Sequence, residues 1–205
     1  MKKTSMQGLA AALLLALSGP FGAARAQGLA EADARFLQAA AGSGMFEVEA
    51  AELAQQRADS SEVQAYAAKM LEQHRAMNGD VKTLALRNQV NLPAQPAEPD
   101  RDTLEQLRSR TGPEFDIAYV QKAGVDAHVM ANRLFQTAAR ESEDPQVRDF
   151  AVRSLPMLAE HLAMSRALQR RPPADADKIH PPVKGEAPAV SPASREAPAS
   201  IAPSR

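Results

Sequence analysis

Three histidines and one glutamate have the types and spacing needed to build a metal site. The set has one member on each of four expected helices: Glu47, His74, His128 and His161. Imidazole and carboxylate groups are ligands for zinc, iron and copper. Burying them without a metal or hydrogen bonds is costly. The set predicts one transition-metal ion (Zn, Cu or Fe). The alternative is histidines that only hydrogen-bond to nearby carboxylates: Glu49, Glu52, Glu72, Asp126 or Glu160.

These residues lie at similar distances from the two short connections that join the expected helices in pairs. Glu47 lies twelve residues before the start of the first connection, and His74 lies fifteen after it. His128 lies sixteen residues before the start of the second connection, and His161 seventeen after it. At 1.5 Å rise per residue, each antiparallel pair is level to within ~5 Å. The spacing therefore predicts that the side chains converge at one level of the core.

Methionines flank two of these histidines in a repeated pattern. They occupy positions −4 and +3 around His74 and His161: Met70, Met77, Met157 and Met164. Thioether and imidazole then share a helical face, which would extend the site toward a soft ion such as Cu(I). The alternative is core packing, since methionine is a flexible core filler. The shared pattern Met-Leu-x-x-His-x-Ala-Met indicates a duplicated helical hairpin, or else chance convergence of two similar helices.

Four amphipathic helices are expected to position these residues, because apolar residues recur every three or four positions and no segment alternates with period two. The first helix is predicted over about 31–58. The second follows Asp59 and Glu62, which have capping-box spacing, and ends before three prolines at 93, 96 and 99. Those prolines open a long connection, about 91–112, with a short helix predicted over about 102–108.

Caps also mark the last two helices. The third begins at residues 111–114 with a Thr-x-x-Glu cap and a proline in its first turn. The fourth begins at Asp144, an N-cap followed by proline, and Pro156 predicts a kink within it. The third helix is expected to bury Phe115, Ala118, Val125, His128, Ala131 and Phe135. Short connections within each pair predict two hairpins, and hence an all-α antiparallel four-helix bundle.

Both ends of the chain are predicted to lie outside this bundle. Residues 1–26 have the charged start, short apolar run and Ala-x-Ala site of a cleavable signal peptide. The bundle is expected to cover 27–171, followed by a disordered Pro/Ala-rich tail at 172–205, where His180 is discounted as a site residue. This organisation predicts a periplasmic or secreted protein of a Gram-negative bacterium, without a membrane span after cleavage.

Composition and missing motifs exclude several classes of protein. The chain has 205 residues, a formal net charge of −1 and no cysteine, which rules out disulfide scaffolds and thiolate metal clusters. The near-neutral charge argues against nucleic-acid binding. No G-x-S-x-G, P-loop or H-E-x-x-H motif is present, so no catalytic residue is assigned. Protein partners are not readable from the sequence.

Several short motifs together resemble one exported bacterial family, catalogued as domain of unknown function 4142. The resemblance covers about residues 30–168 and is carried by Phe36, Gly44-Met45-Phe46-Glu47-Val48, Met70 with His74, Leu92-Pro93, Phe115-Asp116 with Tyr119, His128, Leu155-Pro156 and His161-Leu162. It implies a ferritin-like bundle, sometimes described as an outer-membrane or secreted protein, without an established activity.

The resemblance also allows a test of di-iron chemistry. Ferritin-like di-iron proteins carry Glu-x-x-His on two helices and one glutamate on each of the others. Here Leu71 and Leu158 occupy the positions three before His74 and His161, and His128 stands where a carboxylate is expected. A di-iron centre is therefore not expected, whereas a mononuclear histidine-rich site is compatible.

Three hypotheses for the function remain. The first is an exported ferritin-like module that binds one metal ion or none. The second is a metal-free structural or envelope interaction protein whose buried histidines only form hydrogen bonds. The third, less favoured, is a metal-dependent redox enzyme acting on peroxide, dioxygen or a metal ion.

Overall fold

Residues 28–170 are described by the structure, which is a computed structural model. The predicted signal peptide (1–26) and tail (172–205) lie outside these residues. Throughout the described range the regular structure is helical and contains no strand, which confirms the all-α prediction. In chain order the elements are α1 (Glu31–Arg57), α2 (Ser61–Arg87), α3 (Glu98–Arg108), α4 (Gly112–Tyr119), the π-helical η1 (Val120–Asp126), α5 (Ala127–Glu141) and α6 (Pro145–Gln169).

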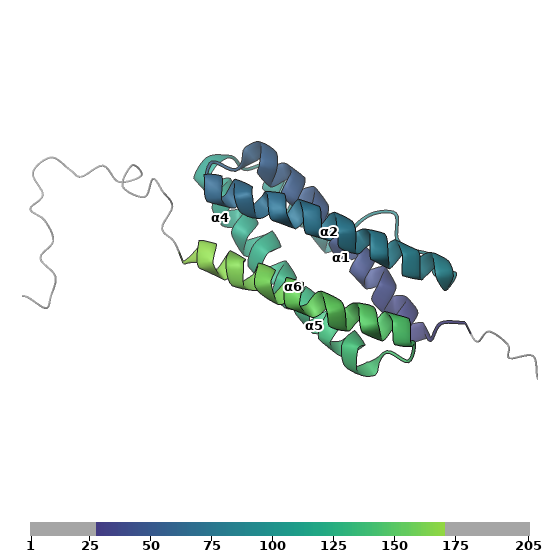
Figure 1. The fold of residues 1–205 in the computed structure, drawn as a ribbon. Helices are drawn as coiled ribbons and strands as arrows, with labels where there is room; N and C mark the ends of the chain where they lie inside the picture. The colour runs from purple at the N-terminus through teal and green to yellow at the C-terminus, as the bar shows by residue number, and fades with distance from the viewer. Residues whose placement is uncertain (1–27, 171–205) are drawn as a thin grey trace, which may run out of the picture.

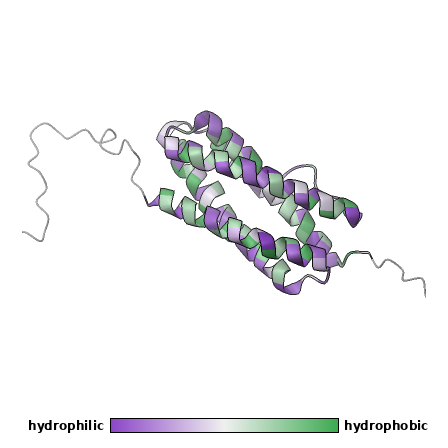
Figure 2. Ribbon diagram, viewed as in Figure 1, coloured by the Kyte–Doolittle hydropathy of each residue, from purple (hydrophilic) through white to green (hydrophobic). Residues whose placement is uncertain are grey.

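The long helices form two packed pairs that combine into a helical bundle (Figure 1). α1 packs along α2, and the α4–η1–α5 stretch packs along α6. Contacts of α2 with α6 and of α1 with α5 join the pairs, while α3 packs on α1. Hydrophobic and hydrophilic residues alternate around each helix, as amphipathic helices require (Figure 2).

Two buried or half-buried aspartates fix the start of α6. The Asp144 side chain accepts hydrogen bonds from the backbone N–H groups of Gln146 and Val147, which confirms the predicted N-cap. The backbone N–H of Asp144 donates in turn to Asp33 of α1, with a distance of 2.8 Å to Oδ2. This bond links the start of α1 to the start of α6, and so joins the two helical pairs.

The start of α2 differs from its prediction. The N-cap residue is Ser60, and no side chain caps the helix within its own first turn, so the capping box proposed for Asp59 and Glu62 is wrong. Instead the backbone N–H groups of Asp59 and Ser60 donate to the carboxylate of Asp116 on α4, at 3.1 and 2.8 Å. A long-range contact thus holds the chain just before α2. At α4, Thr111 is the N-cap residue as predicted, but its side chain makes no capping bond.

The connection between α2 and α3 contains less irregular chain than expected. α3 starts at Glu98 rather than near residue 102, because Pro99 lies in its first turn, where a missing N–H costs nothing. α2 ends at Arg87 with Asn88 as its C-cap, and the next residue, Gln89, has a left-handed φ of 56°. The backbone N–H of Val90 then donates to the Ala85 carbonyl, at 2.9 Å.

The π-helical segment η1 interrupts the third predicted helix and shifts its register. A π turn contains one more residue than an α turn, so residues after it rotate around the axis. Within η1, Val125, expected to be buried, is only half-buried, whereas Ala123 and Gly124 are buried. Just before η1, Ala118 is also half-buried rather than buried, and Tyr119 is buried instead. The other four expected inner residues are buried as predicted: Phe115, His128, Ala131 and Phe135.

α6 remains helical through Pro156, with no break there. Pro156 is exposed, and so is Val152 one turn earlier, whose carbonyl loses its usual donor. Water can therefore satisfy that carbonyl, which explains why the proline is tolerated inside the helix.

Two apolar clusters form the core, one toward each end of the bundle. The first contains Phe36, Phe135 and Phe150, with Phe36 and Phe135 packed edge to face at 5.1 Å between ring centroids. The second contains Phe115 and Tyr119, stacked at 6.0 Å. A layer of buried polar side chains separates the two clusters along the helices. Among the described helices, none is long and apolar enough to cross a membrane.

Candidate metal centre

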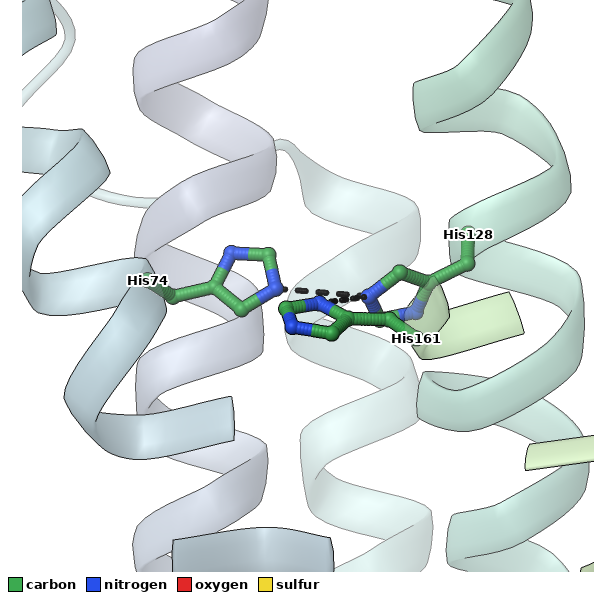
Figure 3. Close-up of side chains that lie close together, drawn as sticks. All are labelled: His74, His128 and His161. Carbon is green, nitrogen blue, oxygen red and sulfur yellow. Dashed lines mark hydrogen bonds between the residues drawn. The ribbon is translucent and has the colours of Figure 1, made fainter. Parts of the chain in front are cut away.

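Three helices each contribute one histidine to the buried polar layer. His74 lies in the middle of α2, His128 follows the π segment as the second residue of α5, and His161 lies on α6. Their side chains are at most 1% exposed. Figure 3 shows the three rings pointing toward one another from their separate helices. The structure thus brings together the three histidines singled out by the sequence.

One nitrogen of each ring converges on a common point. Nε2 of His128 is 3.3 Å from Nε2 of His74 and 3.1 Å from Nδ1 of His161. The three ligand atoms all lie within 4.8 Å of one another. A tetrahedral ion with bonds of about 2.0–2.1 Å to imidazole nitrogens holds them roughly 3.3 Å apart. The two shorter separations therefore match two edges of a tetrahedral metal site.

Hydrogen bonds on the outer sides of two rings determine where their protons lie. Nδ1 of His128 is 3.0 Å from the carbonyl oxygen of Ala123, and Nε2 of His161 contacts Oε1 of Gln73. A backbone carbonyl oxygen only accepts hydrogen bonds, so Nδ1 of His128 carries a proton, and with the amide oxygen of Gln73 facing the ring Nε2 of His161 does too. In neutral rings, Nε2 of His128 and Nδ1 of His161 then present lone pairs to each other.

The surroundings favour neutral rings. Burial lowers the pKa of His74, and the neighbouring His128 and His161 lower it further. Burial is also the main cause of the lowered pKa of His128, and it lowers the pKa of His161 to about 3, with a further contribution from His128. Neutral imidazole is the form that binds metals, so the lone pairs are available near neutral pH.

The π segment explains why His128 can make its outer hydrogen bond. Ala123 lies five residues before His128, inside η1, and the widened turn lets its carbonyl accept from the ring Nδ1–H. Gly124 lies in the same turn, where an added Cβ would come within 2.8 Å of the Ser165 Cβ on α6. Glycine therefore allows η1 to approach α6 closely beside His161.

Glu47 lies next to the three histidines but not among the converging nitrogens. Its Oε1 is 3.4 Å from Nδ1 of His128, the ring nitrogen that faces away from His74 and His161. The glutamate is 1% exposed, and burial followed by the charge of Asp100 raises its pKa well above the usual value. The structure thus places Glu47 behind the His128 ring.

The four flanking methionines belong to the apolar clusters on either side of the histidines. Met77 and Met157 pack in the first cluster, and Met70 and Met164 in the second. These contacts agree with the packing interpretation of the methionines. With a cluster above and below, the histidine layer is screened from water, which strengthens electrostatic interactions inside it.

Two contributors to the site were not identified from the sequence. Gln73 lies off the apolar stripe of α2, and nothing in the helical period shows that it reaches His161. The Ala123 carbonyl is a backbone group exposed to the ring only by the π turn. Tyr119, which is part of the family resemblance, is fully buried, and its hydroxyl has no hydrogen-bond partner among the described residues.

Comparison with known proteins yields one match. The family model described as Domain of unknown function (DUF4142) matches residues 18–168, most of the chain. No curated protein and no solved structure is found to match.

Proposed function

The chain belongs to the family described as Domain of unknown function (DUF4142), and on that premise we propose that it is a metal-binding helical module. His74, His128 and His161 would hold one transition-metal ion in the core. The description of the family names no activity, so the proposal depends on the geometry of the three rings. Metal binding of this kind requires neither a catalytic residue nor a substrate.

A single contact carries the proposal. Nε2 of His128 and Nδ1 of His161 lie 3.1 Å apart, and the outer hydrogen bonds to Ala123 and Gln73 leave both nitrogens without a proton. Two facing lone pairs repel unless a cation or a shared proton lies between them. Burial lowers the pKa of both rings, which argues against a shared proton, and a metal ion bound by both lone pairs is the alternative that we propose.

The donor set limits the kind of ion. Three neutral imidazoles suit Zn²⁺, copper or Fe²⁺, whereas Mg²⁺ and Ca²⁺ prefer oxygen ligands. Three protein ligands also leave a fourth tetrahedral position for water or a small exogenous ligand. Because a small molecule could bind at that open position, a metal-dependent redox enzyme remains a hypothesis, although the less favoured one.

Metal analysis of the natively purified protein tests the proposal. We expect close to one equivalent of zinc, copper or iron by mass spectrometry, and a higher melting temperature when Zn²⁺ is added to the metal-free protein. At a free concentration of 100 times Kd, that ion would stabilise the fold by about 2.7 kcal/mol. A protein that is isolated without metal and whose melting temperature ignores all three ions would contradict the proposal.

The second candidate function is a metal-free structural protein, and the hydrogen bonds of the rings favour it. His128 and His161 both have outer partners, and His74 can donate from Nε2 to Nε2 of His128, at 3.3 Å. Single replacements separate the candidates. Loss of bound metal with a folded protein supports the metal module, whereas destabilisation without any bound metal supports the structural role.

We also propose a ferritin-like antiparallel four-helix topology and export of the protein. The pairing of α1 with α2 and of α5 with α6 supports the topology, and the signal sequence supports a periplasmic or secreted location. N-terminal sequencing of the chain recovered from a periplasmic fraction tests export. The expected first residue is Gln27, and an unprocessed Met1 in the cytoplasm would contradict it.

A further inference from the structure

Glu47 is a fully buried carboxylate with one close charged or polar contact. It lies on α1, and its Oε1 is 3.4 Å from Nδ1 of His128. The same oxygen makes no hydrogen bond to any described residue. A carboxylate is therefore removed from water without the partners that normally compensate for its burial.

No lysine or arginine among the described residues forms an ion pair with Glu47. Tyr66 of α2 and Tyr119 of α4 lie close enough for its charge to act on their hydroxyls, and Asp100 of α3 adds a second negative charge. The one ion-pair contact of Glu47 within the described chain is with His128, whose ring is neutral unless protonated. A buried carboxyl group without such a partner either holds a proton or is balanced by a nearby cation.

The imidazole of His128 connects this carboxylate to the three-histidine site. Its Nδ1 edge faces Ala123 and Glu47, while its Nε2 faces His74 and His161. A carboxylate behind a histidine ligand orients the ring, raises its basicity and balances part of the metal charge. Because the imidazole is rigid and flat, a group on the Nδ1 side acts on the ion through the ring.

We propose that Glu47 is a positioning residue of the metal centre, which holds the Nδ1 side of His128 and offsets the charge of an ion bound at Nε2. This inference rests on the proposed function of the three histidines. It changes the expected role of Glu47 from a ligand to a partner of a ligand. It also gives the buried carboxylate a cation to balance it.

Glu47→Gln tests the role, because the amide keeps the shape and an acceptor oxygen but removes the charge. The matched control is Glu49→Gln, the same change on the same helix, where the carboxylate is 40% exposed and paired with Arg108 at 3.3 Å. Binding of Zn²⁺ and Co²⁺ to the full mature chain is measured by competition with a chelator. We expect E47Q to weaken binding about 10–100-fold, as for other partners of metal-bound histidines, and E49Q to leave it within about threefold.

The visible spectrum of bound Co²⁺ distinguishes a positioning role from direct ligation. If Glu47 acts through His128, the E47Q protein saturated with Co²⁺ keeps the band positions and intensity of the wild type, since the three nitrogens are unchanged. A spectrum with altered coordination would show that Glu47 binds the ion directly and would overturn the inference. Circular dichroism of both variants checks that they are folded.

The outcomes also separate this inference from the proposed function. If the wild type binds no metal, the proposed function fails, and this inference fails with it. If the wild type binds metal and E47Q binds it equally well, the positioning role alone fails. Should E47Q not fold, the pair E47D and E47N makes the same comparison of charged and neutral side chains, and equal affinities would again refute the role.

Discussion

Lowering the pH of the metal-free protein is expected to destabilise it through His161, and one substitution isolates this effect. The His161 ring is fully buried, and burial lowers its pKa to about 3 in the folded protein. In the unfolded chain a histidine has a pKa of about 6.5. Between these two pH values, His161 binds a proton in the unfolded state but not in the folded state. The stabilising contribution is therefore complete above about pH 6.5 and is lost as the pH falls toward 3.

The size of the effect follows from that difference. Each pH unit below 6.5 costs about 1.4 kcal/mol of unfolding free energy per histidine that stays neutral in the fold. Between pH 7 and pH 5, His161 should thus cost about 2 kcal/mol. His74 and His128 act in the same direction, while the raised pKa of Glu47 acts in the opposite one, because the folded state then holds a proton that the unfolded state releases. The wild type and a variant without His161 share these other groups. The difference between their unfolding free energies therefore reports mainly the contribution of the His161 ring.

The assay is urea unfolding of the wild type and of His161→Gln in the presence of a chelator, at intervals from pH 7 to pH 5. We expect the free energy of unfolding to fall less steeply in the variant, by about 1.4 kcal/mol per pH unit below 6.5. His180→Gln, in the predicted tail, is the control and should keep the wild-type slope. Equal slopes for wild type and H161Q would refute the claim that His161 is held neutral in the core.

Four further predictions concern helix packing, a turn and a helix start, each measured by chemical or thermal unfolding. Gly124→Ala should destabilise the protein by about 1–3 kcal/mol, because its Cβ would meet the Ser165 Cβ at 2.8 Å. Gly79→Ala, with nothing within 4 Å, should instead stabilise it by about 0.5–1 kcal/mol, and a loss in both variants would contradict the argument. Gln89→Gly should stabilise by up to about 1 kcal/mol, since its φ of 56° suits glycine; no gain would show that the turn is unstrained. Asp116→Ala should cost about 0.5–2 kcal/mol, because the N–H groups of Asp59 and Ser60 lose their acceptor, and an unchanged stability would disprove this capping role.

Local signals in the sequence identified some elements correctly. Asp144 before Pro145 marked the start of α6, because an N-cap and the helix it caps are neighbours in the chain. Along α2, residues spaced three or four apart from Val63 to Leu84 are all buried, since a regular α-helix returns to the same face at that spacing: Val63, Tyr66, Met70, His74, Met77, Val81 and Leu84.

Other features depended on contacts between distant segments. Asp116 accepts from the N–H of Ser60 from 56 residues away, so the sequence around Ser60 could not reveal this contact. The π turn at η1 is stabilised by its packing on α6 and disrupts the period on which the prediction of Val125 depended. Gln73 contacts His161 across 88 residues from a position outside the apolar stripe.

For the candidate site, the sequence by itself determined which side chains lie at one level of the core, because the helical rise and the short connections set the heights of His74, His128 and His161. The tertiary structure alone decided which atoms of those side chains face one another. Ring orientation depends on the outer bonds to Ala123 and Gln73, and these arise only after the helices have packed. The same packing placed Glu47 behind a histidine ring, since height along a helix does not specify the direction from which a side chain approaches.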